Sequence, residues 1–326
     1  MELTREEDID PAALAGKRVA VIGFGNQGRA QALNLKDSGV DVVVGLRGSS
    51  VSRAVAQELG LKVADLNQAV AAANIVMLLT PDEVQAGLYR DIEPDLRRGA
   101  ALGFSHGLAV HFRQIEPRED LDIFLVAPKG PGTALRSLYQ AGSGMVALWA
   151  VAQDATGGAK AIALAYGHAL GCARAGLIAS TFAEECEADL FNEHAVVWGA
   201  VPEILIAGFE TLVEAGVAPE VAYLECVGEL KLLAELIEAR GIAGMREVIS
   251  NTAEFGALRG GRGIVNDGVR ERMKAILGDI RSGRFARELG AEADGGYKTL
   301  ERSRAEARAH PAEQALRRLR ALHRKA

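Results

Sequence analysis

The sequence predicts an α/β protein with a doubly wound parallel sheet, followed by an all-helical second part. Three observations support this prediction. Short apolar runs alternate with helical stretches between Arg18 and Val151, a glycine-rich turn follows the first run directly, and beyond Gly157 long Ala-, Leu- and Glu-rich segments of helical period dominate. Alternating strands and helices imply right-handed crossovers between parallel strands. We therefore expect the sheet in the first part of the chain only.

Six apolar runs are the predicted strands. Each is a near-continuous apolar segment bounded by Gly, Pro or Asp, as strands buried on both faces of a parallel sheet are. The runs are Val19–Ile22, Val42–Val44, Ile75–Leu79, Ala101–Phe104, Ile123–Val126 and Met145–Leu148. The change of pattern places the domain boundary near Ser180, so the predicted domains are residues 1–180 and residues 181–326.

Composition excludes several classes of protein. The chain has 326 residues, is 49% hydrophobic and carries a net charge of −6, which allows a sizeable core and gives no nucleic-acid footprint. The acidic N-terminus has no apolar segment of a secretory signal, and we expect no apolar run long enough to span a membrane. Three cysteines without C-x-x-C spacing fit a reducing compartment. The prediction is a cytoplasmic protein that binds neither nucleic acid nor membrane.

A glycine-rich turn follows the first predicted strand and opens a helix. It consists of Gly23, Phe24, Gly25, Asn26, Gln27 and Gly28. A dinucleotide site needs such a tight turn, because the backbone must approach the pyrophosphate and a helix N-terminus must point at it. Glycines are common in other turns, but the strand before and the helix after supply the required context. This pattern predicts a Rossmann-type domain.

The end of the second predicted strand indicates which nicotinamide cofactor is bound. Sites that prefer NAD carry an acid there for the ribose 2′-hydroxyl. This chain has Arg47, Ser50 and Ser52 instead. Arginine and hydroxyl groups suit a 2′-phosphate, so we expect NADPH; the alternative is a flexible loop with a solvated arginine.

Loops after the later strands should line the same crevice. His106 and Lys129 each stand just past a predicted strand, which makes them candidates for catalysis. The alternative for each is an ordinary structural role, as a hydrogen-bonded residue or an exposed charge.

Two pairs of acids lie one helical turn apart in the second domain: Asp189 with Glu193, and Glu225 with Glu229. Val221 and Leu233 continue the stripe of the second pair, so we expect that face to point inward. Like charges on one helix face are unfavourable, and buried carboxylates normally protonate, pair or bind a metal. Four oxygen donors suit Mg²⁺. Two solvated acidic faces are the alternative.

In this order the segments resemble ketol-acid reductoisomerase (acetohydroxyacid isomeroreductase) in its short bacterial class I form. The resemblance runs from the first strand to about residue 285. Its most specific segments are Ala32–Gly39, Pro81–Gln85, Ala127–Gly132, Asp189–Phe191, Glu225–Leu232 and Ile249–Glu254.

The resemblance implies an all-α knotted C-terminal domain, a homodimer or larger homo-oligomer, and two Mg²⁺ ions held by the Asp189, Glu193, Glu225 and Glu229 equivalents. In the short form, the partner subunit contributes the second acid pair and the Ser250 equivalent, which binds the substrate carboxylate. His106 matches the family's active-site histidine; Asp82, Gln85 and Gly132 match cofactor contacts, as do the glycine turn, Arg47, Ser50 and Ser52.

The implied reaction is alkyl migration within 2-acetolactate or 2-aceto-2-hydroxybutyrate, followed by NADPH reduction, in valine and isoleucine synthesis. Two divalent cations can stabilise both substrate oxygens, while Glu229 or a metal-bound hydroxide serves as the base. Lys129 and His106 would assist near the nicotinamide.

Several positions depart from the family pattern. Histidines are usual where Arg29 and Gln31 stand, and the other departures are Thr133, Asn192, His194 and Trp198. His194 could add a metal ligand or could pack, and Trp198 could narrow the substrate space. These changes leave open two alternatives: a paralogue acting on a different small keto acid or imine, and a dinucleotide-binding protein without catalysis.

Overall fold

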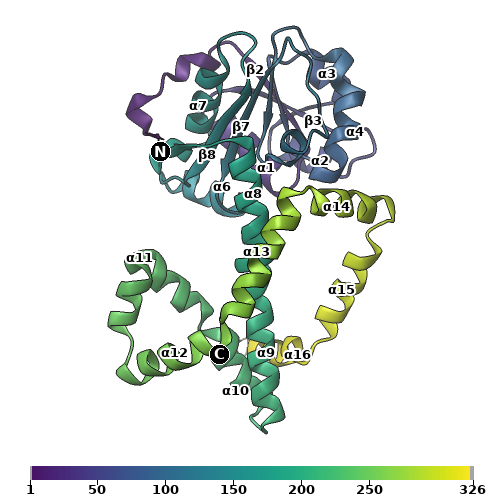
Figure 1. Ribbon diagram of the computed structural model, residues 1–326. Helices are drawn as coiled ribbons and strands as arrows, with labels where there is room; N and C mark the ends of the chain where they lie inside the picture. The colour runs from purple at the N-terminus through teal and green to yellow at the C-terminus, as the bar shows by residue number, and fades with distance from the viewer. Residues whose placement is uncertain (1, 324–326) are drawn as a thin grey trace. The chain divides into compact units, whose positions relative to one another are not determined.

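The computed structural model describes residues 2–323, and the chain divides into two compact units between Ala188 and Asp189 (Figure 1). The first unit contains the sheet and the second unit is helical. Helix α8, Phe182–Phe191, crosses the division. The predicted fold class is confirmed.

The sheet of the first unit has nine strands among the described residues, in the order β1-β9-β8-β7-β6-β5-β2-β3-β4. The strands are β1 Leu3–Thr4, β2 Arg18–Ile22, β3 Asp41–Gly45, β4 Lys62–Ala64, β5 Ile75–Leu78, β6 Ala101–Phe104, β7 Asp122–Pro128, β8 Ala147–Gln153 and β9 Leu177–Ala179. The neighbouring strands β7, β6, β5, β2, β3 and β4 all run parallel to one another. Strand β8 runs antiparallel to β7, and β1 antiparallel to β9. All predicted strands exist, but β8 starts at Ala147 and extends to Gln153, beyond the expected Leu148.

Helices cover both faces of this sheet (Figure 1). They are α1 Asn26–Asp37, α2 Ser52–Glu58, α3 Leu66–Ala71, α4 Asp82–Ile92, α5 Leu108–His111, α6 Gly132–Gln140 and α7 Ala159–Ala169, with short 3₁₀ turns at Glu6–Asp8, Pro11–Leu14, Glu93–Asp95 and Cys172–Arg174. Successive strand residues alternate between two hydrophobic cores, because side chains in a strand point to opposite faces. Val21 lies in the core beneath α1 and α7, whereas Ile22 lies in the other core.

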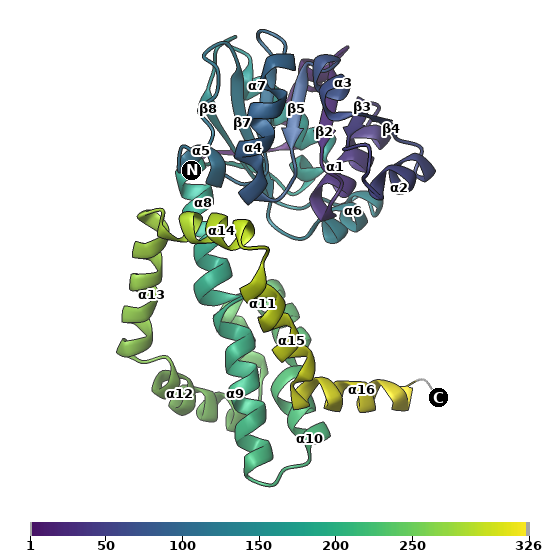
Figure 2. The same cartoon turned by 90° about the vertical axis from the view of Figure 1, so that its right-hand side faces the viewer.

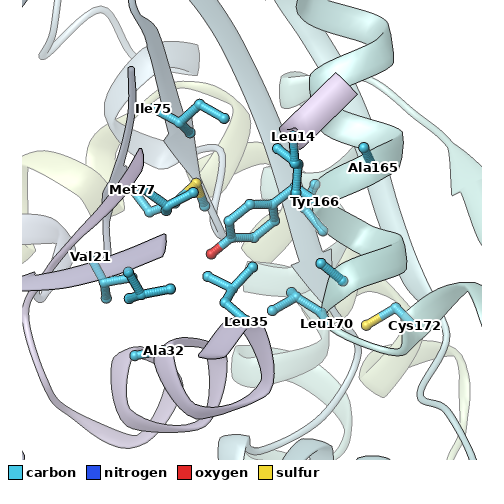
Figure 3. Packing of buried hydrophobic residues seen from close by; sticks show 14 of the residues in the cluster. Leu14, Val21, Ala32, Leu35, Ile75, Met77, Ala165, Tyr166, Leu170 and Cys172 are labelled. Carbon is cyan, nitrogen blue, oxygen red and sulfur yellow. The ribbon is translucent and has the colours of Figure 1, made fainter. Parts of the chain in front are cut away.

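Tyr166 is the largest side chain that is fully buried. It stands on α7 and meets Phe124 edge to face, with ring centroids 5.9 Å apart. Such aromatic pairs add about 0.5–1.5 kcal/mol beyond their buried area. Figure 3 shows Tyr166 between Leu14 and Leu35, with its hydroxyl group directed away from α7. That hydroxyl therefore needs a polar partner inside the core.

The second unit consists of helices joined by short turns (Figure 2). They are α9 Ala200–Glu214, α10 Pro219–Tyr223, α11 Leu230–Val248, α12 Asn251–Ile264, α13 Asp267–Arg281, α14 Arg284–Asp294, α15 Lys298–Ala309 and α16 Pro311–His323, with π-helical turns at Asn192–Val196 and Leu224–Gly228. A small core joins α9, α10 and α16, where Phe209 packs with Ala222, Ala312 and Ala315. Helix α11 is broken at Gly241, whose φ is +68°.

Among the described residues, one continuous helical segment is long and apolar enough to cross a membrane by length and composition alone. It is Phe182–Glu214, which includes α8 and α9, and an 18-residue window within it has a mean hydropathy of 1.6. The expectation that no segment reaches this length is therefore wrong. The same helix carries Asp189, Glu193 and Glu203, and an acid near a bilayer centre costs about 2.5–3.5 kcal/mol. An apolar helix that serves a protein interface passes the same test.

Candidate active site

The glycine turn lies between β2 and α1. Gly23 has a φ of +103°, and a side chain there would also meet the backbone of Leu79, so this position requires glycine. Gly25 faces open space and serves as the N-cap of α1. The first backbone N–H groups of the helix thus point to a position that a pyrophosphate can approach closely. This geometry fits the predicted dinucleotide.

The start of α6 lies against the same turn. Gly132 lies against the backbone of Asn26, and the Thr133 N–H donates to Asn26 Oδ1 at 3.1 Å. Two helix N-termini therefore meet at the turn. Thr133 makes this contact through its backbone N–H. The contact therefore does not depend on its side chain, and a residue that departs from the family pattern can stand here.

The loop between β3 and α2 carries the predicted determinants of cofactor choice. Arg47 is exposed, and the Ser52 N–H donates to Ser50 Oγ at 3.3 Å. Arg53 holds this loop in place, because it donates to Leu46 O at 2.9 Å and pairs with Asp65 at 2.9 Å. Sequence reasoning missed Arg53, since an arginine in the first turn of a short helix reads as a solvated charge.

His106, Asp82 and Gln85 come together at the carboxyl edge of the sheet. His106 Nδ1 lies 3.1 Å from Asp82 Oδ2, and Gln85 Nε2 donates to Asp82 Oδ1 at 3.1 Å. Gln85 Nε2 also donates to the carbonyl of Thr80. Among the described residues, Gln85 Oε1 and the Thr80 hydroxyl have no hydrogen-bond partner although both are buried. Buried polar atoms of this kind mark places that a ligand or water completes.

The environment of His106 favours its charged form. Burial alone lowers the pKa of His106, but hydrogen bonds with Asp82 and Cys186, and the charges of Asp82 and Glu185, hold that pKa well above its ordinary value. Asp82 therefore fixes both the orientation and the charge of the ring.

Lys129 is joined to a buried acid that sequence reasoning missed. Lys129 Nζ donates to Glu185 Oε1 at 2.8 Å, and Glu185 Oε2 accepts the Gly107 N–H at 2.8 Å. Glu185 is 1% exposed. It precedes Asp189 by four residues on α8, so it shares that helix face. This spacing was the signal that could have identified it.

A π-helical turn is present at each of the two predicted acid pairs. Glu193 lies within the turn Asn192–Val196 and Glu225 within Leu224–Gly228, while Glu229 ends the second turn. Single π-turns inside helices are frequent at functional sites. Glu225 and Glu229 are exposed, and so are Val221 and Leu233. The expectation that this face points inward is therefore wrong within a single chain.

The described part of one chain does not gather the four acids into one cluster of ligand atoms. Glu225 and Glu229 form no ion pair among the described residues. Ser250 caps α12, where its Oγ accepts the Ala253 N–H at 3.2 Å, and it is exposed.

The unusual residues of the second unit have distinct environments. The His194 ring stacks edge to face on Phe285 at 4.1 Å, and burial lowers the pKa of His194. This geometry favours the packing role over that of a metal ligand. Trp198 is 66% exposed, and Asn192 begins the first π-turn.

Residues 13–176 match the family described as "Acetohydroxy acid isomeroreductase, NADPH-binding domain". Residues 182–325 match the family described as "Ketol-acid reductoisomerase, C-terminal domain". The chain belongs to the ketol-acid reductoisomerase family. A solved structure of an NADH-preferring ketol-acid reductoisomerase from an uncultured archean is 42% identical, with a TM-score of 0.95 over 99% of each chain. The resemblance predicted from the sequence is confirmed.

More distant structures share the fold alone. A putative oxidoreductase from Jannaschia sp. CCS1 is 18% identical, with a TM-score of 0.62 over 82% of this chain and 97% of that one. Pyrroline carboxylate reductase from Plasmodium falciparum is 12% identical, with a TM-score of 0.52 over 82% of this chain and 98% of that one. The nicotinamide-binding domain and the oxidoreductase class follow from the ketol-acid reductoisomerase family.

Proposed function

We propose that the protein converts 2-acetolactate and 2-aceto-2-hydroxybutyrate to 2,3-dihydroxy-3-alkyl acids in branched-chain amino-acid synthesis. One observation carries the proposal: Lys129, Glu185, His106 and Asp82 form a charged cluster at the carboxyl edge of the sheet. Ligands of doubly wound sheets bind at this edge. Reduction of a keto group places negative charge on its oxygen, and the positive charges of Lys129 and His106 can stabilise that charge.

Within this cluster each side chain has a separate task. His106 is held by Asp82 at Nδ1 and its raised pKa favours the protonated ring, so it can deliver a proton to the substrate oxygen as hydride arrives. Lys129 supplies positive charge, and Glu185 fixes its position through the 2.8 Å ion pair. Glu229 is the candidate base that removes the substrate hydroxyl proton.

NADPH is the proposed cofactor. Arg47 and the hydroxyls of Ser50 and Ser52 offer charge and hydrogen bonds for a 2′-phosphate. The nearby Asp65 forms an ion pair with Arg53 at 2.9 Å, which offsets the negative charge that would repel a 2′-phosphate. The related archaeal enzyme prefers NADH, so the ratio of kcat/KM for the two cofactors is the decisive measurement.

Two Mg²⁺ ions are proposed to bind at Asp189, Glu193, Glu225 and Glu229. The donor set consists of carboxylates only, which is the chemistry that Mg²⁺ prefers. When bound, such ions act as Lewis acids and hold both substrate oxygens. Removal of the charge by Glu225→Gln should weaken Mg²⁺ binding measured by calorimetry.

A second copy of the chain is proposed to complete the site with its Glu225, Glu229 and Ser250 equivalents. Helices α11 and α12 have no buried residue within one described chain. Leu232, Ile242 and Phe255 are 59%, 60% and 62% exposed. Large apolar surfaces of this kind mark interaction sites. Light scattering should show a dimer or a larger assembly, which Leu232→Glu weakens.

We also propose a cytoplasmic location and a domain boundary near Ser180. The three cysteines are free, which supports a reducing compartment.

The function is tested by NADPH oxidation with 2-acetolactate, with Mg²⁺ present and then chelated by EDTA. The rearranged acid 3-hydroxy-3-methyl-2-oxobutyrate is assayed in parallel. Turnover of both compounds, with Mg²⁺ required for 2-acetolactate, supports the proposal. Turnover of the rearranged acid alone identifies a reductase without alkyl migration, and bound NADPH without any turnover refutes both.

A further inference from the structure

A fully buried glutamine lies beneath the candidate active site. Gln31 is on α1, is 0% exposed, and has every hydrogen-bonding atom of its amide satisfied. Gln31 Nε2 donates to Gln27 Oε1 at 3.1 Å and to Ser105 Oγ at 2.9 Å. Gln31 Oε1 accepts the Tyr166 hydroxyl at 2.8 Å. This is the polar partner that the buried tyrosine requires (Figure 3).

Gln31 is connected to three loops of the site, to two of them directly and to the third through Gln27. Gln27 is in the glycine turn and donates to Gly130 O at 2.9 Å, next to Lys129. Ser105 precedes His106 and anchors its own loop by donating to Val126 O at 2.9 Å. One amide therefore joins the cofactor turn to the loops that carry both candidate catalytic side chains.

We propose that Gln31 is a positioning residue that keeps the cofactor turn, His106 and Lys129 in mutual register. This inference rests on the proposed function. Buried, fully satisfied polar networks specify one arrangement of the groups they join. A displacement of about 1 Å at a reacting centre can cost about 100-fold in rate. Tyr166 fixes the orientation of the Gln31 amide, because its hydroxyl donates to Gln31 Oε1. The amide nitrogen Nε2 must then face Gln27 in the glycine turn and Ser105 in the loop after β6.

The test replaces Gln31 with methionine, which has similar volume and cannot form these bonds. The matched control is Asn34→Leu. Asn34 is also fully buried on α1, and it donates to Leu170 O and accepts from Arg136, away from the three loops. Both variants lose buried hydrogen bonds of one helix, but only Gln31→Met uncouples the loops.

The expected result is a fall in kcat of about 10-fold or more for Gln31→Met, with a change in the NADPH KM of less than about 3-fold. Asn34→Leu should lose similar thermal stability and keep kcat. Ser105→Ala keeps the Gln31 amide but removes both hydrogen bonds of the Ser105 hydroxyl, to Gln31 and to Val126 O, and it should lower kcat in the same direction. An unchanged kcat in folded Gln31→Met, or an equal loss in Asn34→Leu, overturns the proposal.

Amide hydrogen exchange separates this proposal from the proposed function. In the free protein, Gln31→Met should speed exchange of residues 105–107 and of Lys129 and Gly130, and Asn34→Leu should not. If the wild type fails to turn over 2-acetolactate while exchange behaves as expected, the proposed function falls and the network stands. If exchange in these loops is unchanged, the network is refuted whatever the activity.

Discussion

Removal of the Lys129 side chain should destabilise the protein through the acid that it leaves behind. In Lys129→Met, Glu185 keeps the Gly107 N–H as a donor but loses its ion pair. The acid is 1% exposed, so water cannot replace the lost partner. The variant therefore retains a buried carboxylate that has lost its ion-pair partner.

The magnitude follows from the burial of each partner. Breaking a buried pair by removing one member costs about 3–5 kcal/mol. Lys129 is 31% exposed and already keeps part of its hydration, so we expect a loss at or just below the lower end of that range, about 2–3 kcal/mol. The double variant Lys129→Met with Glu185→Gln should be more stable than Lys129→Met alone, because the stranded charge is gone.

Urea unfolding followed by circular dichroism measures these free energies, in EDTA and at one protein concentration because self-association adds to stability. Lys160→Met is the matched control. Its partner Glu2 is exposed, at 3.1 Å, and surface pairs contribute about 0–1 kcal/mol. If the losses of unfolding free energy in the two single variants add up to the loss in the double variant, the two charges are not coupled and the reasoning is refuted.

Three further predictions concern cofactor choice, pH dependence and thiol reactivity. Arg47→Ala should raise the NADPH KM about 10-fold, because one charge-assisted hydrogen bond contributes about 1.5 kcal/mol. The NADH KM should stay nearly unchanged. Equal effects on both cofactors would contradict a contact between Arg47 and the 2′-phosphate. His106 has its pKa raised in the folded state, so its stabilising effect is complete below the ordinary pKa of about 6.5 and is lost as pH rises through the folded-state pKa. In EDTA, the difference in unfolding free energy between wild type and His106→Gln should therefore be largest below about pH 6.5 and should shrink as the pH rises above that value; a constant difference would exclude a charged His106. Burial raises the pKa of the Cys172 thiol to about 12, so alkylation of Cys172, followed by peptide mass spectrometry, should be as slow as global unfolding, and rapid labelling in native buffer would argue against this burial.

The first unit could be predicted well because its signals are local. Each central strand is one apolar run, and the glycine turn has its strand and helix beside it in the sequence. The short strands β1, β4 and β9 were missed, since two or three residues carry too little pattern. Strand β8 began later than expected, because Met145 and Val146 are apolar yet precede the pairing of Ala147 with Pro128.

The candidate site was only partly predictable, because its partners are distant in sequence. Lys129 and Glu185 are 56 residues apart, and no pattern in the chain links them. The sequence marks Gln31 only as a departure from the family pattern. Its hydrogen-bond partners lie on α1, after β6 and on α7, and they come together only in the folded protein. The exposed Glu225 and Glu229 were expected to face inward, because a sequence does not show whether an apolar stripe is covered by its own chain or by another.

Helix α8 has a consequence for engineering of chimaeric enzymes. Its first turns carry Glu185, which is hydrogen-bonded to the sheet unit, and its next turn carries Asp189. Each residue of an α-helix advances by about 100° around the axis. A single inserted or deleted residue between these two acids would turn one away from the direction of the other. Recombination between relatives should therefore join the parental chains in the segment before Phe182, so that one parent supplies the whole of α8, and not at the junction of the compact units.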